Sequence, residues 1–245
     1  MRVAVAGGTG LVGRLVVAGL RAAGHDPVVL ARSQGIDLTS GVGLAERIDG
    51  CGAAIDVTNR LTTRRKIATE FFTKVTGNLA AAAREAGVGH LIALSIVGID
   101  RVDYGYYLGK RAQEEVVSAS GVPWTVLRAT QFFEFPEQLL THHFPLAPMP
   151  RMLCQPVAAA DVATELVRLA EAGPSGRIVQ IAGPEKLPMV DMARRIERAR
   201  GSRRPVLPVP MPGKAGRGMT HGGLLPQGEY VTGERTFADY LASLR

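Results

Sequence analysis

A glycine-rich run near the first residue constrains the fold of this 245-residue chain more than any other feature. Directly after a short apolar segment at residues 2–6, the chain reads Gly7-Gly8-Thr9-Gly10-Leu11-Val12-Gly13. Apolar residues then recur with helical spacing up to residue 23. Glycines at this spacing, between a strand and a helix, allow a tight turn and a close approach of the backbone to a pyrophosphate. The helix N-terminus favours the same anion through its free N–H groups and its dipole, so the run predicts a dinucleotide-binding site.

Apolar runs alternate with helical patterns along the rest of the chain. We expect strands at residues 2–6, 27–31, 53–57, 91–96, 124–129 and 177–181, and helices at 11–23, 44–48, 67–86, 104–120, 158–171, 189–200 and 236–244. A further strand is expected to end at Asp37 and Leu38, and the Pro- and Gly-rich residues 202–233 are expected to be irregular. This alternation implies right-handed crossovers and a parallel sheet that is covered on both faces.

The pattern predicts an α/β fold, a Rossmann-type doubly wound parallel sheet with a small C-terminal substrate-binding portion. We expect one domain over residues 1–245. Its dinucleotide-binding core would span about residues 1–130, and about 131–245 would contribute the substrate pocket.

The residues after the second predicted strand favour NADP over NAD. An NAD site usually carries Asp or Glu about 20 residues beyond the glycines, where it holds the ribose 2′-hydroxyl. Residues 27–36 contain no carboxylate. Arg32 suits a 2′-phosphate through forked, charge-assisted contacts, and Ser33 adds a hydroxyl donor. The alternative is that Arg32 is a solvated charge at a strand end. Asp37 and Leu38 are candidates to flank the adenine.

A serine, a tyrosine and a lysine form the candidate catalytic set. Ser95 lies near the end of a predicted strand, and Tyr106 and Lys110 follow in a predicted helix. Tyrosine at i and lysine at i+4 share one helix face. A phenol with a pKa of about 10 needs a nearby cation to act as an acid or base at neutral pH. A serine at the adjacent strand end can bond a substrate carbonyl. Tyr104 and Tyr107 lie close enough in sequence to be alternative acids.

Several segments together resemble a known superfamily. They are the glycine run, Ala86-Gly87-Val88-Gly89-His90, the strand leading to Ser95, the Tyr106/Lys110 pair, Gly121-Val122-Pro123-Trp124-Thr125-Val126-Leu127-Arg128-Ala129-Thr130-Gln131-Phe132-Phe133, and Gln155-Pro156-Val157 with Asp161-Val162-Ala163. Over about residues 1–185 the chain resembles the short-chain dehydrogenase/reductase superfamily, and more narrowly its atypical, NmrA-like branch of NAD(P)-binding proteins.

The resemblance implies a role for each matching position. The pyrophosphate would be lined by Gly7, Thr9, Gly10, Leu11 and Val12, and the adenosine ribose phosphate would meet Arg32 and Ser33. Val57, Thr58 and Asn59 would pass under the cofactor, and Ala129 and Thr130 would approach the nicotinamide amide. Tyr106 would donate a proton, Lys110 would assist it and bind cofactor, and Ser95 would polarise the carbonyl. Asn78 would hold a water molecule, or else be satisfied by its own helix.

These expectations define an NADPH-dependent oxidoreductase that reduces a carbonyl or quinone-type small molecule. The alternative is a non-catalytic, NADP-binding redox sensor, because some NmrA-like proteins lack a working tyrosine. Phe132, Phe133 and Met152 are expected to line an apolar or aromatic substrate pocket, and core packing is the equal alternative for the two phenylalanines.

The composition and charge of the chain bear on whether it binds nucleic acid, a membrane or a metal. The chain carries 29 Lys and Arg against 22 Asp and Glu, for a net charge of +7. The basic clusters at 64–66 and 194–204 lack interleaved aromatic residues, so we expect solvated faces rather than a nucleic-acid surface. No apolar stretch is long enough for a membrane span. Two cysteines favour a reduced, cytoplasmic setting. The adjacent His142 and His143 face different ways, and we expect no metal site. The sequence specifies no oligomeric state.

Overall fold

A seven-stranded sheet forms the centre of the computed structural model, which describes residues 1–140 and 145–244. Its strands are β1 (Arg2–Ala6), β2 (Asp26–Leu30), β3 (Cys51–Asp56), β4 (His90–Ile96), β5 (Trp124–Ala129), β8 (Ile178–Ala182) and β11 (Val231–Thr232). Their order across the sheet is β11-β8-β5-β4-β3-β1-β2. The pairings of β1 with β2 and β3, of β3 with β4, and of β8 with β11 are all parallel. The predicted doubly wound α/β fold is therefore confirmed.

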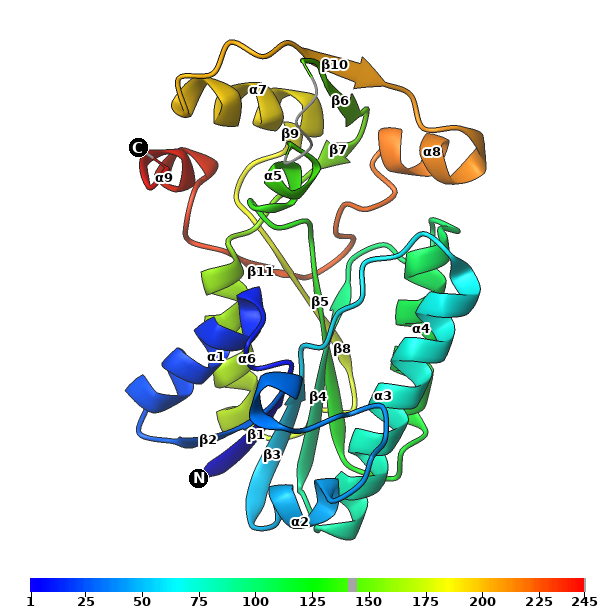
Figure 1. Cartoon of the computed structure of the whole chain (residues 1–245), viewed down its shortest axis with the longest axis vertical. Helices are drawn as coiled ribbons and strands as arrows, with labels where there is room; N and C mark the ends of the chain where they lie inside the picture. The colour runs from blue at the N-terminus through cyan, green and yellow to red at the C-terminus, as the bar shows by residue number, and fades with distance from the viewer. Residues whose placement is uncertain (141–144, 245) are drawn as a thin grey trace. The chain divides into compact units, whose positions relative to one another are not determined.

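Helices cover both faces of this sheet (Figure 1). They are α1 (Leu11–Ala22), α2 (Leu44–Ile48), α3 (Arg65–Glu85), α4 (Gly105–Ser118) and α6 (Ala159–Ala172). In Figure 1, α1 and α6 lie on one face, and α3 and α4 pack side by side on the other. In α1, the buried residues Val12, Val16 and Leu20 recur every four positions, which places them on one stripe facing the sheet.

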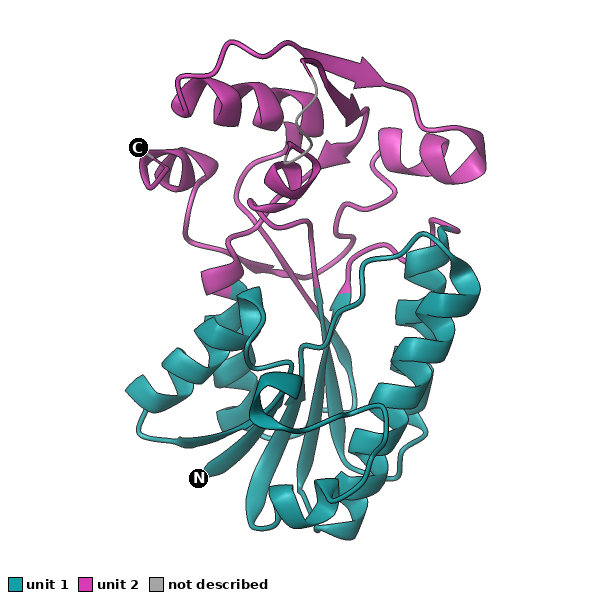
Figure 2. Cartoon of the chain, viewed as in Figure 1, with its two compact units in different colours: residues 1–95, 104–128, 162–179 teal, residues 96–103, 129–161, 180–245 magenta. Residues whose placement is uncertain are grey.

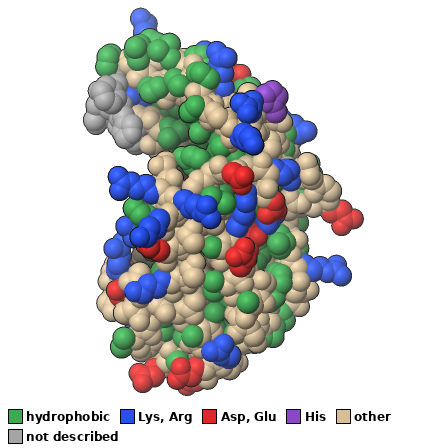
Figure 3. All heavy atoms as spheres, turned by 90° about the vertical axis from the view of Figure 1, so that its right-hand side faces the viewer, with side chains coloured by type: hydrophobic (Ala, Val, Ile, Leu, Met, Phe, Trp, Pro, Cys, Tyr) green, Lys and Arg blue, Asp and Glu red, His purple; other side chains and the backbone are tan. Residues whose placement is uncertain are grey.

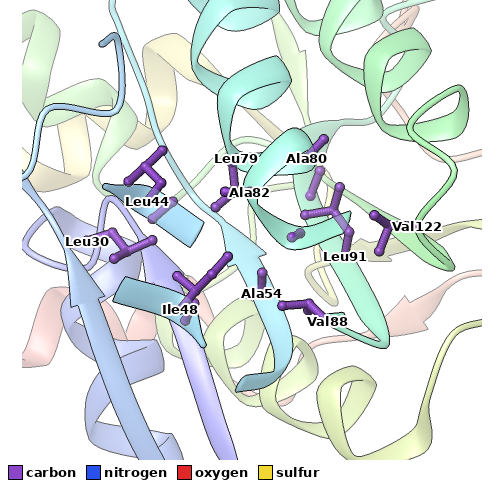
Figure 4. Close-up of a cluster of buried hydrophobic side chains, with 14 of the residues drawn as sticks. Leu30, Leu44, Ile48, Ala54, Leu79, Ala80, Ala82, Val88, Leu91 and Val122 are labelled. Atoms are coloured by element: carbon purple, nitrogen blue, oxygen red, sulfur yellow. The ribbon is translucent and has the colours of Figure 1, made fainter. Parts of the chain in front are cut away.

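The apolar strands are buried because both of their faces are covered. Leu30, Ala54 and Leu91, from β2, β3 and β4, pack with Ile48 of α2 and Leu79 of α3 (Figure 4). Fully burying a leucine side chain contributes about 1.5–3 kcal/mol. This cluster is the physical reason that these strands read as continuous apolar runs.

The backbone divides into two compact units that interleave along the sequence (Figure 2). Unit 1 comprises residues 1–95, 104–128 and 162–179, and unit 2 comprises 96–103, 129–161 and 180–245. The expected arrangement as one domain with a division near residue 130 stays a prediction.

Unit 2 consists of short elements. Besides β11, they are α5 (Phe135–Leu140), β6 (Ala147–Pro150), β7 (Leu153–Cys154), β9 (Leu187–Pro188), α7 (Met189–Ala199), β10 (Val206–Val209), α8 (Gly213–Thr220) and α9 (Phe237–Ala242). β10 pairs with β6, and β7 with β9, in separate two-stranded sheets. The expectation that residues 202–233 are irregular is therefore wrong, because they contain β10, α8 and β11. Proline is tolerated in β10 because both strands of a two-stranded sheet are edges.

The strand expected to end at Asp37 and Leu38 is absent from this fully described stretch. The short 3₁₀ helix η1 (Arg32–Gln34) follows β2 and ends at Gly35, which has a φ of 73°. The Asp37 side chain then accepts hydrogen bonds from Thr39, which turns the chain locally. Local turn chemistry overrides the strand pattern here.

Candidate active site

The glycine run forms a tight connection between β1 and α1. Gly7 has a φ of 80°, and its N–H donates to the Leu30 carbonyl of β2 at 2.9 Å. A Cβ at Gly13 would lie 2.1 Å from the Gly7 carbonyl oxygen. Only glycine therefore allows the first turn of α1 to approach the end of β1 this closely.

The N-terminus of α1 has the features of an anion site. Its N-cap is Gly10, which has no side chain that could cap the helix, and the first turn contains no acidic residue. Thr9, Gly10 and Leu11 are exposed, and Val12 is buried beneath them. Uncapped N–H groups and the positive end of the helix dipole attract phosphate. The loop therefore fits the pyrophosphate of a dinucleotide.

Arg32 and Ser33 lie exposed at the carboxyl end of β2, the strand beside β1. Hydrogen bonds from the Thr39 side chain and backbone lower the pKa of Asp37, and the Arg32 charge acts in the same direction. Leu38 is buried. A cationic side chain thus lies on the surface one strand away from the glycine loop.

Asn78 of α3 holds the loop that follows η1. Its Nδ2 donates to the Leu38 carbonyl at 2.9 Å and to the Thr39 carbonyl at 3.1 Å. Both of its N–H donors bond to this loop rather than to its own helix. Asn78 therefore fixes the conformation of the segment that carries Asp37 and Leu38.

Ser95 lies near the end of β4, which is the strand between β3 and β5. The residue is 2% exposed, and its Oγ has no hydrogen-bond partner in the described part of the chain. Leaving a buried hydroxyl unpaired costs about 1–3 kcal/mol, and such groups call for a water or a ligand. The carboxyl edge of a doubly wound sheet is where ligands bind.

Tyr106 is in the first turn of α4, and its hydroxyl donates to Asn59 Oδ1 at 2.6 Å. Burial raises the pKa of Tyr106 well above its ordinary value, and the Asn59 bond opposes this only in part. The Tyr106 ring packs edge-on against Phe72 of α3, at 5.8 Å between ring centroids. The phenol is thus held in its protonated form, facing the residues after β3.

Lys110 is one turn further along α4 and points into the interior. Its Nζ donates to the Leu94 carbonyl at 3.0 Å and to Gln113 Oε1 at 2.8 Å, and lies 4.3 Å from the centre of the Phe72 ring. Burial lowers the pKa of Lys110 to about 8, and the charges of Asp56 and Glu114 act against this shift. Within the described part of the chain, the Tyr106 hydroxyl and the Lys110 ammonium bond to other groups and not to each other.

Asp56, the last residue of β3, is the centre of a buried polar network that the sequence analysis did not identify. Its Oδ1 accepts from the Thr58 N–H at 2.9 Å and the Thr58 hydroxyl at 2.6 Å. Its Oδ2 accepts from the Thr76 hydroxyl at 2.7 Å and from Gln113 Nε2 at 2.9 Å. A sequence signal existed, because Thr76 and Gln113 are polar residues on the buried stripes of α3 and α4.

The remaining predicted residues belong to unit 2. Ala129 is the last residue of β5 and Thr130 follows it, and the Thr130 hydroxyl donates to the Gln155 carbonyl at 2.6 Å. The backbone of Phe132 forms an isolated parallel β-bridge with that of Val157. Met152 is buried between β6 and β7. The assignment of these residues to cofactor and substrate stays a prediction.

Phe133 lies in a buried aromatic cluster of unit 2. Its ring centroid is 5.4 Å from that of Phe237 and 5.6 Å from that of Tyr240, both from α9. Phe133 is only 2% exposed. These contacts favour the core-packing alternative for Phe133.

Basic side chains on the visible surface are mixed with acidic ones (Figure 3). In the 194–204 cluster, Arg200 pairs with Glu137 at 2.7 Å and Arg204 with Glu197 at 2.8 Å. Among the described residues, no group of three or more His, Cys, Asp and Glu is arranged to hold a metal ion. His142 and His143 lie outside the described residues. No described helix is long and apolar enough to cross a membrane.

The fold and the glycine loop define a dinucleotide-binding protein of the Rossmann type. A family model described as NAD(P)H-binding matches residues 35–172, which is more than half of the chain. The chain belongs to this NAD(P)H-binding family, within the atypical short-chain dehydrogenase/reductases, and the resemblance predicted from the sequence is confirmed.

Individual proteins are similar over most of the chain. A curated relative from Streptomyces griseus subsp. griseus, (4-alkanoyl-5-oxo-2,5-dihydrofuran-3-yl)methyl phosphate reductase, is 29% identical over 213 residues, covering 80% of this chain and 73% of that protein. The Escherichia coli NADPH-dependent quinone oxidoreductase QOR2, solved with NADPH, has a TM-score of 0.74 at 19% identity, covering 99% of each chain. The Bacillus cereus UDP-N-acetylglucosamine 4-epimerase has a TM-score of 0.75 at 17% identity, covering 100% of this chain and 95% of that one. The two structural similarities show the fold alone.

Proposed function

We propose that this protein is an NADPH-dependent reductase of a carbonyl- or quinone-type small molecule. The observation that carries the proposal is the buried, unpartnered Ser95 hydroxyl at the carboxyl edge of the sheet. The next helix along the chain presents the protonated Tyr106 phenol, and the same unit carries the glycine loop. The curated relative, which is itself a reductase, supports this choice of reaction.

The proposed roles follow from the state of each group. When bound at the glycine loop, NADPH would supply the hydride for the reduction. The Ser95 hydroxyl donates a hydrogen bond to the carbonyl oxygen, and Tyr106 transfers its proton to that oxygen. Asn59 accepts the Tyr106 hydrogen bond in the absence of substrate and so holds the phenol ring in place. Val57 and Thr58 lie directly before Asn59, and their backbone lies so close to Gly7 that a Cβ there would be 3.0 Å from the Val57 carbonyl oxygen.

The preference for NADPH rests on the surface after β2. Arg32 and Ser33 are exposed there, so both are accessible to a 2′-phosphate. Asp37 accepts two hydrogen bonds from Thr39, which occupy one of its carboxylate oxygens. We assign the phosphate to Arg32 and Ser33, and the adenine to the neighbourhood of Asp37 and Leu38.

The substrate is proposed to be apolar or aromatic around its carbonyl. The relative's name describes an oxo-dihydrofuran ring with an alkanoyl substituent and a phosphate. Conjugated lactones of this kind therefore belong in the test panel beside quinones and ketones.

The test follows nicotinamide absorbance while the protein turns over NADPH with this panel. Tyr106→Phe is expected to lower kcat about 100-fold or more, because the phenylalanine ring fills nearly the same space but has no hydroxyl that could donate a proton. NADPH affinity should stay near that of the wild type, which shows that the variant is folded.

Two matched variants locate the acid. Tyr104→Phe and Tyr107→Phe are expected to retain most of the activity. Loss of turnover in either of them, with Tyr106→Phe unaffected, would reassign the acid. Tight NADPH binding without turnover of any compound would instead favour a redox sensor.

A further inference from the structure

A buried lysine and a buried carboxylate are joined through one glutamine in unit 1. Lys110 is 4% exposed, and Asp56 and Gln113 are fully buried. Gln113 Oε1 accepts from the Lys110 ammonium at 2.8 Å, and Gln113 Nε2 donates to Asp56 at 2.9 Å. The amide orientation is fixed by chemistry, because an ammonium only donates and a carboxylate only accepts. We call these three side chains the Lys110–Gln113–Asp56 bridge.

Two of the three N–H donors of Lys110 are engaged in hydrogen bonds within the protein. An ammonium has three N–H groups. Two of them meet the Leu94 carbonyl and Gln113, and the Phe72 ring lies 4.3 Å from the nitrogen. A cation within about 6 Å of an aromatic ring is attracted to the face of that ring. Three contacts with the protein itself therefore hold the Lys110 ammonium inward.

We propose that Lys110 is a positioning residue rather than a cofactor ligand, and that the Lys110–Gln113–Asp56 bridge aligns the two polar groups of the site. Through the Leu94 carbonyl, Lys110 fixes β4 immediately before Ser95. Through Thr58, Asp56 fixes the residue immediately before Asn59, which holds Tyr106. This alignment rests on the proposed reductase function, whereas the bridge itself does not.

The two buried charges depend on each other. Removing one partner of a buried pair leaves an uncompensated charge in a site of low polarity, whereas removing both is often tolerated. Glu114 also acts on Lys110, but its carboxylate is bonded to Arg128 at 2.6 Å. Asp56 is therefore the charge that the Lys110 ammonium balances.

The test is a double-substitution cycle with Lys110→Met, Asp56→Asn and the combined variant. Thermal unfolding midpoints and NADPH dissociation constants, from the quenching of NADPH fluorescence, are measured for each. Each single variant should unfold at a lower temperature than the wild type. The combined variant should recover most of the loss, because Gln113 can turn its Oε1 toward the new asparagine. Its NADPH dissociation constant should lie within about threefold of the wild type.

The outcomes separate the two roles of Lys110. A combined variant that is stable but binds NADPH about tenfold more weakly or worse would identify Lys110 as a cofactor ligand and overturn the proposal. Additive losses of stability would overturn the bridge. Lys66→Met, at an exposed lysine paired with Glu70, is the control and should change neither quantity. If wild type binds no NADPH, the proposed function fails while the stability cycle still tests the bridge.

Gln113→Leu tests positioning directly. It should lower kcat about tenfold and leave the KM for NADPH unchanged, because Ser95 and Tyr106 lose their alignment while the glycine loop is untouched. An unchanged kcat, or a raised KM for NADPH, would contradict the positioning role.

Discussion

The glycine loop and the Lys110–Gln113–Asp56 bridge belong to the same unit and are built on opposite principles. The loop uses backbone groups from seven consecutive residues, Gly7 to Gly13, and works because side chains are missing. The bridge uses side chains from β3 and α4, far apart in sequence, and depends on hydrogen bonds between those side chains. A site made of consecutive backbone groups can be recognised from a short stretch of sequence. A site made of buried side chains from distant segments can be recognised only once the fold is known.

Because of this difference, we expect the loop to control ligand binding and the bridge to control stability. The loop presents N–H groups to a ligand, so its failure should appear first as lost binding. The bridge faces inward and its hydrogen bonds are made within the protein, so a substitution that breaks it should first lower the stability of the fold.

Gly13→Ala should give the largest effect on binding. Its Cβ would lie 2.1 Å from the Gly7 carbonyl oxygen, so the loop must move away from α1. We expect NADPH affinity, measured by fluorescence titration, to fall about 100-fold, or about 2.7 kcal/mol. The control is Gly77→Ala in α3, where a Cβ would meet nothing within 4 Å. Unchanged NADPH binding in Gly13→Ala would refute the loop as the pyrophosphate site.

Thr76→Val should affect stability rather than binding. The substitution removes one of the donors to Asp56 and keeps the shape of the side chain. We expect the free energy of unfolding to fall by about 1.5–3 kcal/mol in denaturant titrations, since the lost bond is to a charged group. Thr73→Val, at an exposed position on α3, should be nearly neutral. A large loss of NADPH affinity in Thr76→Val would erase the distinction between the two regions.

Arg32→Ala should change cofactor choice without changing the fold. Arg32 is exposed at the carboxyl end of β2, so its loss removes a contact to the 2′-phosphate and little packing. We expect the preference for NADPH over NADH, taken as the ratio of dissociation constants, to fall about tenfold. Arg21→Ala, at the exposed end of α1, should leave this ratio unchanged. An unaltered ratio in Arg32→Ala would assign the phosphate to other residues.

The pH dependence of the reaction should show the smallest effect. Burial raises the pKa of Tyr106, so the phenol keeps its proton at every pH below its ordinary value of about 10. The single-turnover oxidation of bound NADPH should therefore be flat between about pH 5 and pH 7, a range in which Lys110, with a pKa of about 8, keeps its charge. A rate that falls through an apparent pKa within this range would indicate an ammonium close to the phenol, and would contradict the inward placement of Lys110.

Much of unit 1 was predictable because its signals are local. The bounds of β1, α2 and β5 agree with the sequence analysis to the residue. The helical placement of Tyr106 and Lys110 also follows from local periodicity. The direction of Lys110 does not, because it depends on Asp56 and Gln113, whose positions tertiary packing sets.

Unit 2 was less predictable for a related reason. The strands that lie wholly within it are two to four residues long, and several are defined only by pairing with a segment distant in sequence. β10, at Val206–Val209, pairs with β6, at Ala147–Pro150, and neither segment has an alternating apolar pattern. Short strands rich in proline carry too few residues for periodicity to distinguish them from loops.

The position of β11 at the edge of the sheet has a consequence for the chain while it is being synthesised. Val231 and Thr232 pair with Ile181 and Ala182 of β8, some fifty residues earlier in the chain. While the ribosome is still adding those fifty residues, the backbone groups at this end of β8 lack their strand partner. An unpaired edge is a template for other chains, so the nascent protein passes through a period in which association competes with completion of the sheet.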